Sequence, residues 1–343
     1  MKQHLNTLFV TTQGAYLSQY GEALQVKVED ETRLQLPLHT IGGIVCFGQV
    51  GVSPWLMGKC AELGIAISFL SEQGKFHARV VGFTPGNVLL RREQYRRADD
   101  GPACAAIARN IVAAKIANAR TVLLRSMRDY PDADGRDELE SAAGRLAYSL
   151  QQVQKANDLE WTRGMEGESA STYFGVFARL ITSQREGFTF VGRNRRPPLD
   201  PVNALLSFLY AMLGHDARAA CEAVGLDAQV GFLHRDRPGR AGLALDLMEE
   251  FRPFLADRLA LSLINRQQVQ PDGFRRTESG GIEMNDETRK MVLTAYQKRK
   301  QDTITHPFLG EETTVGLLIH LQARLLARHL RGDLDGYPPF IWK

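Results

Sequence analysis

The spacing of apolar residues changes near residue 90, and this change constrains the fold more than any other feature of the sequence. Before it, short apolar segments are separated roughly every eight to twelve residues by turns containing Gly, Ser or Glu-Asp. ALQVKV and RLQLPL alternate apolar with polar residues, which is typical of half-buried strands. After Gly101-Pro102, apolar residues recur three and four positions apart, as in CAAIARNIVAAKIANAR, which predicts helices. The sequence therefore predicts an α+β protein of two domains.

The domain boundaries follow from the same pattern. We expect a β-rich, β-sandwich-like domain over residues 1–90, a charged linker over 91–100 and an all-α domain over 101–343. SPWLMGKCAELG has helical spacing after a Ser-Pro start, so one short helix should cross the first domain. The expected strands are TLFVTT, AYLSQY, ALQVKV, RLQLPL, GGIVCFG, GIAISFL and HARVVGF. Besides CAAIARNIVAAKIANARTVLLRSM and RDELESAAGRLAYSLQQVQ, helices are expected at 165–184, 200–225, 244–264, 286–300 and 311–331, followed by an extended Pro-Pro tail.

Composition excludes several classes of protein. With 343 residues, 44% hydrophobic and 24% charged, the chain has the make-up of a globular protein rather than a disordered, collagen-like or disulfide-rich one. No apolar run approaches the roughly 18 residues of a membrane span, and the N-terminus shows no signal-peptide core, so we expect a cytoplasmic protein. The four cysteines lie far apart without CxxC spacing, which favours reduced, buried thiols over a zinc site.

Charge is distributed unevenly along the chain. Residues 1–90 hold 6 Lys/Arg and 6 Asp/Glu, whereas the remaining residues hold 36 and 33. The charge per residue therefore roughly doubles at the proposed boundary, which supports two domains of different character.

Glu166 lies where an acid is not expected. On a helical wheel, Ala170, Tyr173 and Phe177 fall within about 60° of Glu166, whereas Glu168 falls on the opposite side. Burying a carboxylate costs several kcal/mol unless a cation or donor meets it, so Glu166 is a candidate for catalysis or metal binding. Two simpler interpretations stay open: a first-turn acid favoured by the helix dipole, or a helix that begins later.

A second acidic helix, ALDLMEEFRPFLADRLAL, is strongly amphipathic. Asp246, Glu249 and Glu250 lie opposite its apolar face, so a solvated acidic face is the simplest interpretation. His234 lies twelve residues before Asp246 and could be a metal ligand if its loop folds back over these acids. Glutamates with one histidine would form a mixed oxygen and nitrogen site, which suits Mn²⁺ or Mg²⁺.

Arginines are frequent around these acids. Guanidinium groups beside a divalent metal would suit a polyanionic substrate, since phosphate contacts supply most nucleic-acid affinity. A helical surface laced with weak salt bridges is the alternative interpretation. The candidates for DNA binding are Arg163, Arg193, Arg195, Arg196, Arg235, Arg237 and Arg240.

Four segments carry a resemblance to a known family. KIANAR, GMEGESASTYF, RNRRPPLDPVNALLSFLY and GFLHRDRPGRAGLALDLMEEFRP resemble, in this order, the CRISPR-associated integrases of spacer acquisition. The resemblance covers nearly the whole chain and is nearest to the type I-C group.

The resemblance implies a ligand set. The family's first metal-binding glutamate precedes a glycine, which selects Glu166, and its histidine falls on His234. Its third motif has two acids three apart on a helix, matched by Asp246 and Glu249. The later acid is the family's third ligand, so Glu249 takes that role, and Asp246 becomes a supporting residue or a candidate for a second metal.

Two further residues and the activity are also implied. Asn203 and Tyr210 match PVNALLSFLY and would order the site or contact DNA. The family inserts double-stranded prespacer DNA beside CRISPR repeat DNA by phosphodiester transesterification, with Mg²⁺ or Mn²⁺ as cofactor. Its β-rich domain forms a homodimer, its helical domain is catalytic, and two dimers flank a dimer of the second CRISPR-associated protein. A metal-dependent nuclease of branched DNA or RNA in repair, or a non-catalytic nucleic-acid-binding scaffold, stays open as an alternative.

Overall fold

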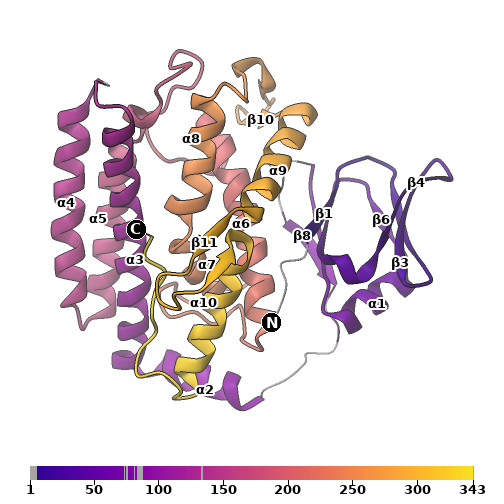
Figure 1. The fold of residues 1–343 in the computed structure, drawn as a ribbon, viewed down its shortest axis with the longest axis horizontal. Helices are drawn as coiled ribbons and strands as arrows, with labels where there is room; N and C mark the ends of the chain where they lie inside the picture. The colour runs from indigo at the N-terminus through magenta and orange to yellow at the C-terminus, as the bar shows by residue number, and fades with distance from the viewer. Residues whose placement is uncertain are drawn as a thin grey trace.

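A computed structural model describes residues 6–72, 74, 76–80, 82, 88–132 and 134–342. A β-rich N-terminal region lies beside a larger helical region (Figure 1). The mixed α+β class predicted from the sequence is therefore confirmed.

The β-rich region contains eight strands and one helix among its described residues. They are β1 (Asn6–Val10), β2 (Tyr16–Tyr20), β3 (Ala23–Val28), β4 (Glu31–Pro37), β5 (Ile41–Phe47), β6 (Gly51–Val52), α1 (Pro54–Leu63), β7 (Ala66–Leu70) and β8 (Phe76–Val80). Every expected strand and the expected helix are present, although Val81 and Phe83 of HARVVGF lie outside the described residues. Helix α1 starts where Ser53 Oγ accepts a hydrogen bond from Leu56 N at 3.3 Å, and it ends at Gly64 with φ 69°.

The strands form two four-stranded sheets. The first has the order β1-β5-β7-β8, with β1, β5 and β7 parallel and β8 antiparallel. The second has the order β4-β3-β2-β6 and is antiparallel except for the β2–β6 pair. Parallel neighbours need a crossover, and α1 lies in the connection from β5 to β7. Both sheets and α1 contribute to one buried apolar cluster.

Strand β5 joins the two regions. Ile44 and Cys46 belong to the core of the β-rich region, whereas Val45 and Phe47 belong to the core of the helical region. The ring of Phe47 lies 6.0 Å from that of Phe208. The strand is buried on both faces, which is typical of parallel strands and explains its continuous apolar sequence.

The helical region is built around a long central helix. Helix α3 has 29 residues and is therefore about 44 Å long. The helices are α2 (Val88–Asp99), α3 (Gly101–Asp129), α4 (Arg136–Gln154), α5 (Leu159–Gly175), α6 (Pro201–Ala223), α7 (Gly242–Glu249), α8 (Arg258–Asn265), α9 (Asp286–Gln301) and α10 (Val315–Leu330).

The stretch predicted to be a charged linker is helical instead. Helix α2 covers residues 88–99. Its charged residues are mostly exposed, but one face of the helix is buried. Leu90 and Gln94 are buried on that face, and Gln94 Nε2 donates to the carbonyls of Asp227 and Val230 at 2.8 Å each. The charge run therefore belongs to the first helix of the helical region.

The prediction of an all-α second region is also wrong in detail. Two short antiparallel pairs join its helices: β9 (Phe274–Arg276) with β10 (Ile282–Met284), and β11 (Thr303–Thr305) with β12 (Glu312–Thr314). Because β12 occupies the start of the helix expected from 311, α10 begins only at Val315.

Two further helices differ from the prediction. Helix α5 begins at Leu159 rather than 165, because Asp158 Oδ1 caps it by accepting from Trp161 N at 2.6 Å, and it ends at Gly175. The expected helix 244–264 is broken into α7, a π-helical turn η3 (Arg252–Asp257) and α8. Pro253 lacks the amide hydrogen that would bond Glu249 O, which accounts for the break.

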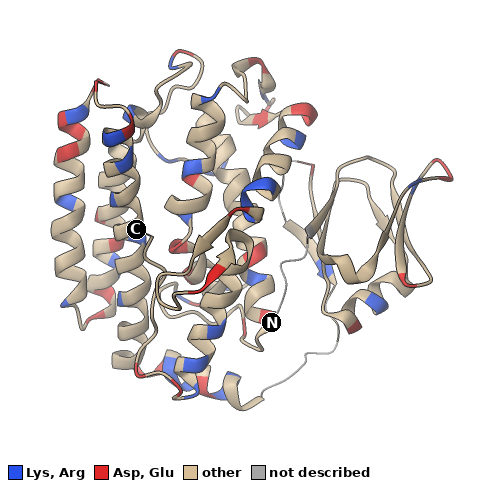
Figure 2. Ribbon diagram, in the orientation of Figure 1, with Lys and Arg blue, Asp and Glu red and all other residues tan. Residues whose placement is uncertain are grey.

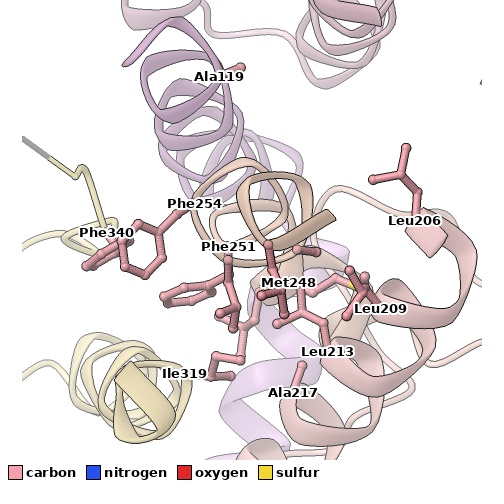
Figure 3. Close-up of a cluster of buried hydrophobic side chains, with 14 of the residues drawn as sticks. Ala119, Leu206, Leu209, Leu213, Ala217, Met248, Phe251, Phe254, Ile319 and Phe340 are labelled. Atoms are coloured by element: carbon pink, nitrogen blue, oxygen red, sulfur yellow. The ribbon is translucent and has the colours of Figure 1, made fainter. Parts of the chain in front are cut away.

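The C-terminal tail, predicted to be extended, has neither helix nor strand over residues 337–342 and packs into the core. Phe340 is fully buried, with its ring 5.0 Å from Phe251 and 5.1 Å from Phe254, in the cluster drawn in Figure 3. Asn118 of α3 fixes the tail, since its Nδ2 donates to Phe340 O at 2.9 Å and its Oδ1 accepts from Trp342 N at 2.8 Å. The end of the chain thus closes the core beside α7.

The structure also bears on the predictions about membrane spans and cysteines. No helix in the described ranges is long and apolar enough to cross a bilayer. Cys46, Cys60, Cys104 and Cys221 are buried free thiols, as predicted. Burial raises the pKa of Cys46 to about 12.

Candidate functional site

Three predicted residues from separate segments lie near one another, and a largely buried lysine contacts two of them. Glu166 comes from α5, His234 from the loop before α7, and Glu249 from the end of α7. The Nζ of Lys115, on α3, forms ion pairs with Glu166 Oε1 and, at 2.7 Å, with Glu249 Oε2. His234 Nε2 lies 3.8 Å from Glu249 Oε1.

Glu166 lies on the inner face of α5, as its helical wheel predicts. Its side chain is 27% exposed, whereas Glu168 is exposed on the outer face. Because the helix begins at Leu159, Glu166 lies in its third turn, well inside the helix. The interpretation of Glu166 as a first-turn acid favoured by the helix dipole is therefore wrong.

The acids of α7 are buried rather than solvated. Asp246 and Glu250 have no exposed surface, and Glu249 is 2% exposed. Helix α7 packs against α3, α6 and α10, so its polar side is covered as well as its apolar side. The prediction of a solvated acidic face is wrong, and each buried carboxylate has its own set of partners.

Glu249 is held ionised by its neighbours. Burial alone would raise its pKa, but Arg252, followed by Lys115 and His234, outweighs burial and lowers the pKa to about 2. Arg252 Nη2 lies 3.1 Å from Glu249 Oε1. The π-helical turn places this arginine directly after the helix that carries Glu249.

Asp246 orients His234. Its Oδ2 accepts from the backbone amides of Phe232 and Leu233 at 2.6 and 3.0 Å, and its Oδ1 accepts from His234 N at 3.0 Å. His234 Nδ1 lies 2.6 Å from the same Oδ1. A carboxylate can only accept, so Nδ1 donates to Asp246, and this contact turns Nε2 toward Glu249. With these four contacts, Asp246 holds the loop and the imidazole in place.

The donor chemistry of this site suits a hard divalent cation, but its spacing is not that of a formed metal site. Two carboxylates and an imidazole nitrogen match the donors that Mg²⁺ or Mn²⁺ accepts. Within the described residues, no three His, Cys, Asp or Glu side chains lie close enough together to hold a metal. The ammonium of Lys115 lies between Glu166 and Glu249 instead.

Glu250 points away from the site and binds the tail. Its Oε2 accepts from Phe340 N at 2.7 Å and from Gln322 Nε2 at 3.0 Å, and its Oε1 lies 2.5 Å from Tyr337 Oη. Burial raises the pKa of Glu250 to about 8 despite these bonds. Adjacent acids thus have opposite pKa shifts, because only Glu249 has cationic neighbours.

The two residues of PVNALLSFLY have different surroundings. Tyr210 donates to Asp257 Oδ1 at 2.7 Å, and Arg252 lies over its ring at 4.8 Å, so it borders the site. Asn203 is fully buried; its Nδ2 donates to Gly192 O at 2.8 Å, and its Oδ1 accepts from Arg193 Nη1 at 2.6 Å. Asn203 therefore orders the loop before α6 and cannot touch DNA directly.

Three of the candidate DNA-binding arginines are engaged within the chain. Arg163 Nε donates to Leu233 O at 2.6 Å, which ties α5 to the loop of His234. Arg193 also donates to Ser207 Oγ at 3.2 Å, and Arg235 pairs with Glu160.

The other four arginines are available to a ligand. Arg195, Arg196 and Arg237 are exposed, Arg240 is half-buried, and none has an ion pair with a described residue. Burial and then Arg237 lower the pKa of Arg240, with Arg195 adding to the shift and Asp246 opposing it. Arg195, Arg237 and Arg240 therefore lie near Asp246, in a helical region that carries most of the charge in Figure 2.

Lys115 and Arg252 were not predicted from the sequence. The sequence did contain a signal for Lys115. Lys115 lies three or four positions from residues on the buried face of the helix: Ile111, Val112, Asn118 and Ala119. A lysine on that face needs an acidic partner.

The sequence matches one family model. The model described as CRISPR associated protein Cas1 matches residues 8–298. CRISPR-associated endonuclease Cas1 1 of Chlorobaculum tepidum is 53% identical over 343 residues, covering 100% of both chains. CRISPR-associated endonuclease Cas1 2 of Rhodospirillum rubrum is 53% identical over 348 residues, again covering 100% of both.

Solved structures share the fold. A casposase bound to integration product has a TM-score of 0.85 and 22% identity, covering 99% of this chain and 95% of that one. A Cas6-RT-Cas1–Cas2 complex has a TM-score of 0.83 and 24% identity, covering 100% of this chain and 36% of the longer one. At these identities the likeness concerns the fold alone.

Proposed function

The chain belongs to the CRISPR associated protein Cas1 family, and from that membership we propose that it is a metal-dependent DNA integrase and endonuclease of CRISPR adaptation. Its proposed substrates are double-stranded prespacer DNA and CRISPR repeat DNA. The observation that carries the proposal is that Glu166, His234 and Glu249 approach one another from three separate segments.

The proposed reaction is a phosphodiester transesterification. A 3′-hydroxyl of the prespacer attacks a phosphodiester of the repeat, a new P–O bond forms, and the old P–O bond breaks to release a 3′-hydroxyl. The attacking hydroxyl loses a proton and the leaving oxygen gains one. One ester replaces another, so no ATP is consumed. Water in place of the prespacer hydroxyl would give the endonuclease activity.

Glu166, His234 and Glu249 are the proposed catalytic residues, and they would act by holding Mg²⁺ or Mn²⁺. When bound, the ion would supply Lewis-acid catalysis, lowering the pKa of the attacking hydroxyl and stabilising the leaving oxygen. Arg252 keeps Glu249 ionised, so this ligand needs no deprotonation near neutral pH. Asp246 fixes the imidazole with Nε2 toward the ligand set.

The proposed DNA surface consists of the arginines beside the site. Arg195, Arg196, Arg237 and Arg240 would contact phosphates directly, because they have no ion pair among the described residues. Arg163, Arg193 and Arg235 would belong to the same surface, and we propose that their contacts within the chain hold its loops.

We also propose that the protein forms the same assembly as its family. Residues 1–90 would form the β-sandwich-like dimerisation domain, and residues 101–343 with α2 the catalytic domain. Two homodimers would flank a dimer of the second CRISPR-associated protein, Cas2, in a heterohexamer. Membership of the Cas1 family supports the partner, and the four ordered motifs support the type I-C group.

A strand-transfer assay tests the proposal. The wild type, with Mn²⁺, should join a labelled prespacer carrying free 3′-hydroxyls to a duplex with a leader and repeat. Glu166→Ala should abolish joining while keeping the wild-type circular dichroism spectrum. Glu168→Ala is the matched control, since it removes an exposed acid two residues away on the same helix and should leave the rate unchanged.

Each alternative gives a different result in this assay. Cleavage of branched DNA or RNA without joining would indicate the repair nuclease. DNA binding with neither cleavage nor joining would indicate the scaffold. Joining by Glu166→Ala at the wild-type rate would contradict the assignment of the site.

A further inference from the structure

Lys115 is an unusual cation for its position. It lies on α3 between Ala114 and Ile116, both buried, and its own side chain is 12% exposed. Its ammonium contacts one oxygen of Glu166 and one oxygen of Glu249. The lysine therefore bridges two acids from helices that are far apart in the sequence.

The bridge conflicts with a divalent cation at the same carboxylates. A divalent cation held by Glu166 and Glu249 would lie next to the ammonium that already contacts both carboxylates, and like charges at such short range repel strongly inside a protein. The ammonium must therefore move for the proposed metal to bind. A buried ammonium that leaves its partners needs new acceptors, because an unpaired buried charge is strongly unfavourable.

Such acceptors lie beside Lys115. A small cavity of about 20 Å³ is lined by Lys115 together with Ser169, Tyr173, Tyr210, Arg252 and Asp257. Asp257 uses Oδ1 to accept from Tyr210. Asp257 Oδ2 and Ser169 Oγ are buried and have no hydrogen bond of standard geometry with any described residue, although the hydroxyl of Tyr173, in the same cavity, also interacts with Asp257. The cavity thus offers a second carboxylate oxygen and a hydroxyl.

We propose that Lys115 is a positioning residue with two places: it holds Glu166 and Glu249 together before metal binding, and it withdraws toward Asp257 and Ser169 when the divalent cation enters. The inference rests on the proposed metal-dependent function. In its first position, Lys115 keeps two acids at close range without a metal. In its second position, the ammonium is still paired with an acceptor, so the metal can bind without leaving a buried charge unpaired.

A double-mutant cycle on Mn²⁺ affinity tests the proposal. Titration calorimetry of the full chain would compare the wild type with Lys115→Met, Asp257→Asn and the double variant. Lys115→Met should bind Mn²⁺ at least tenfold more tightly, because no ammonium has to be displaced. Asp257→Asn should bind it about fivefold or more weakly, because the displaced ammonium loses its acceptor. In the Lys115→Met background, Asp257→Asn should have no effect.

Two results overturn the proposal. One is an unchanged or weaker Mn²⁺ affinity for Lys115→Met. The other is an equal loss from Asp257→Asn in both backgrounds, which would mean that Asp257 acts on the metal without Lys115. Lys155→Met, an exposed lysine at the end of α4, is the matched control and should leave the affinity unchanged.

Stability measurements keep the test informative if a variant folds poorly. In EDTA, Lys115→Met should melt below the wild type, because Glu166 and Glu249 lose their counter-ion, and Mn²⁺ should restore more of its melting temperature than it adds to the wild type. Lys115→Gln, which keeps a donor without the charge, should show the same two effects. An equal Mn²⁺ response in all three proteins would contradict the inference.

The two levels of proposal fail differently. If the wild type shows no Mn²⁺ binding that depends on His234, the metal-dependent function fails, and the role of Lys115 fails with it. If that binding is present but is insensitive to Lys115→Met, only the role of Lys115 fails.

Discussion

His234 Nδ1 lies 2.6 Å from Asp246 Oδ1, and this contact sets the direction of the imidazole. The same carboxylate accepts three backbone amides of the loop that carries His234. One buried acid therefore fixes both the loop and the ring, and it leaves Nε2 facing Glu249 at 3.8 Å.

Asp246→Asn should weaken the metal site without removing a ligand. The asparagine side chain puts an NH₂ group where a carboxylate oxygen accepted backbone N–H groups, and these unpaired donors cost about 1–3 kcal/mol of stability. The imidazole also loses its charged acceptor. Changes of this kind typically lower metal affinity about 10–100-fold. Mn²⁺ titration checks the effect, with Asp236→Asn as control because Asp236 is exposed on the same loop. Equal affinities of the two variants would contradict this role of Asp246.

Glu250→Gln should change how stability depends on pH. Burial raises the pKa of Glu250 to about 8 in the folded protein, whereas an unfolded glutamate has a pKa of about 4.3. Glu250 therefore stays protonated to a higher pH in the folded state than in the unfolded state. The stability that this difference contributes is fully present below about pH 4.3 and is lost as the pH rises from there to about 8. The slope is at most about 1.4 kcal/mol per pH unit.

The glutamine has no such proton to lose. Urea unfolding between about pH 6.5 and 8 should therefore show a steeper loss of stability for the wild type than for Glu250→Gln, with Glu140→Gln, an exposed change, following the wild type. Parallel curves for all three proteins would show that Glu250 is ionised throughout.

Phe340→Ala should destabilise the whole helical region. The ring is fully buried and packs against both Phe251 and Phe254 (Figure 3), so its removal should cost about 3–5 kcal/mol. Denaturant unfolding measures the loss, and Ile341→Ala, at a half-buried position next to it, should cost less. Similar losses for both variants would mean that the tail contributes little to the core.

Removing the exposed arginines should weaken DNA binding and its salt dependence. The variant Arg195→Ala/Arg196→Ala/Arg237→Ala should bind duplex DNA more weakly, and the slope of log affinity against log salt should fall by about 2–3. Arg33→Ala on β4, at the far end of the β-rich region (Figure 1), is the control. An unchanged slope in the triple variant would place the DNA elsewhere.

The sequence predicts best those features that depend on neighbouring residues. Alternation predicts β3, and a Ser-Pro start predicts α1, because each signal lies within its own element. The inner position of Glu166 follows in the same way from the apolar residues of α5. The break at Pro253 also had a local signal, the missing amide hydrogen.

Features set by distant packing could not be predicted in this way. The wheel of α7 shows one apolar side, but its acidic side is covered by α3, α10 and the tail. Glu250 meets Phe340 across 90 positions of sequence. Asp246 and Glu249 are likewise buried by segments that a single-helix pattern does not include. The metal-ligand roles of Glu166, His234 and Glu249 came from the family resemblance and remain proposals.

The most direct measurement is diffraction from crystals of the protein soaked in Mn²⁺, with anomalous scattering used to locate the ion. We predict one strong peak within bonding distance of Glu166, His234 Nε2 and Glu249, with the ammonium of Lys115 moved away from both carboxylates. Crystals soaked in saturating Mn²⁺ that show no peak there, with Lys115 still bridging Glu166 and Glu249, would contradict the account.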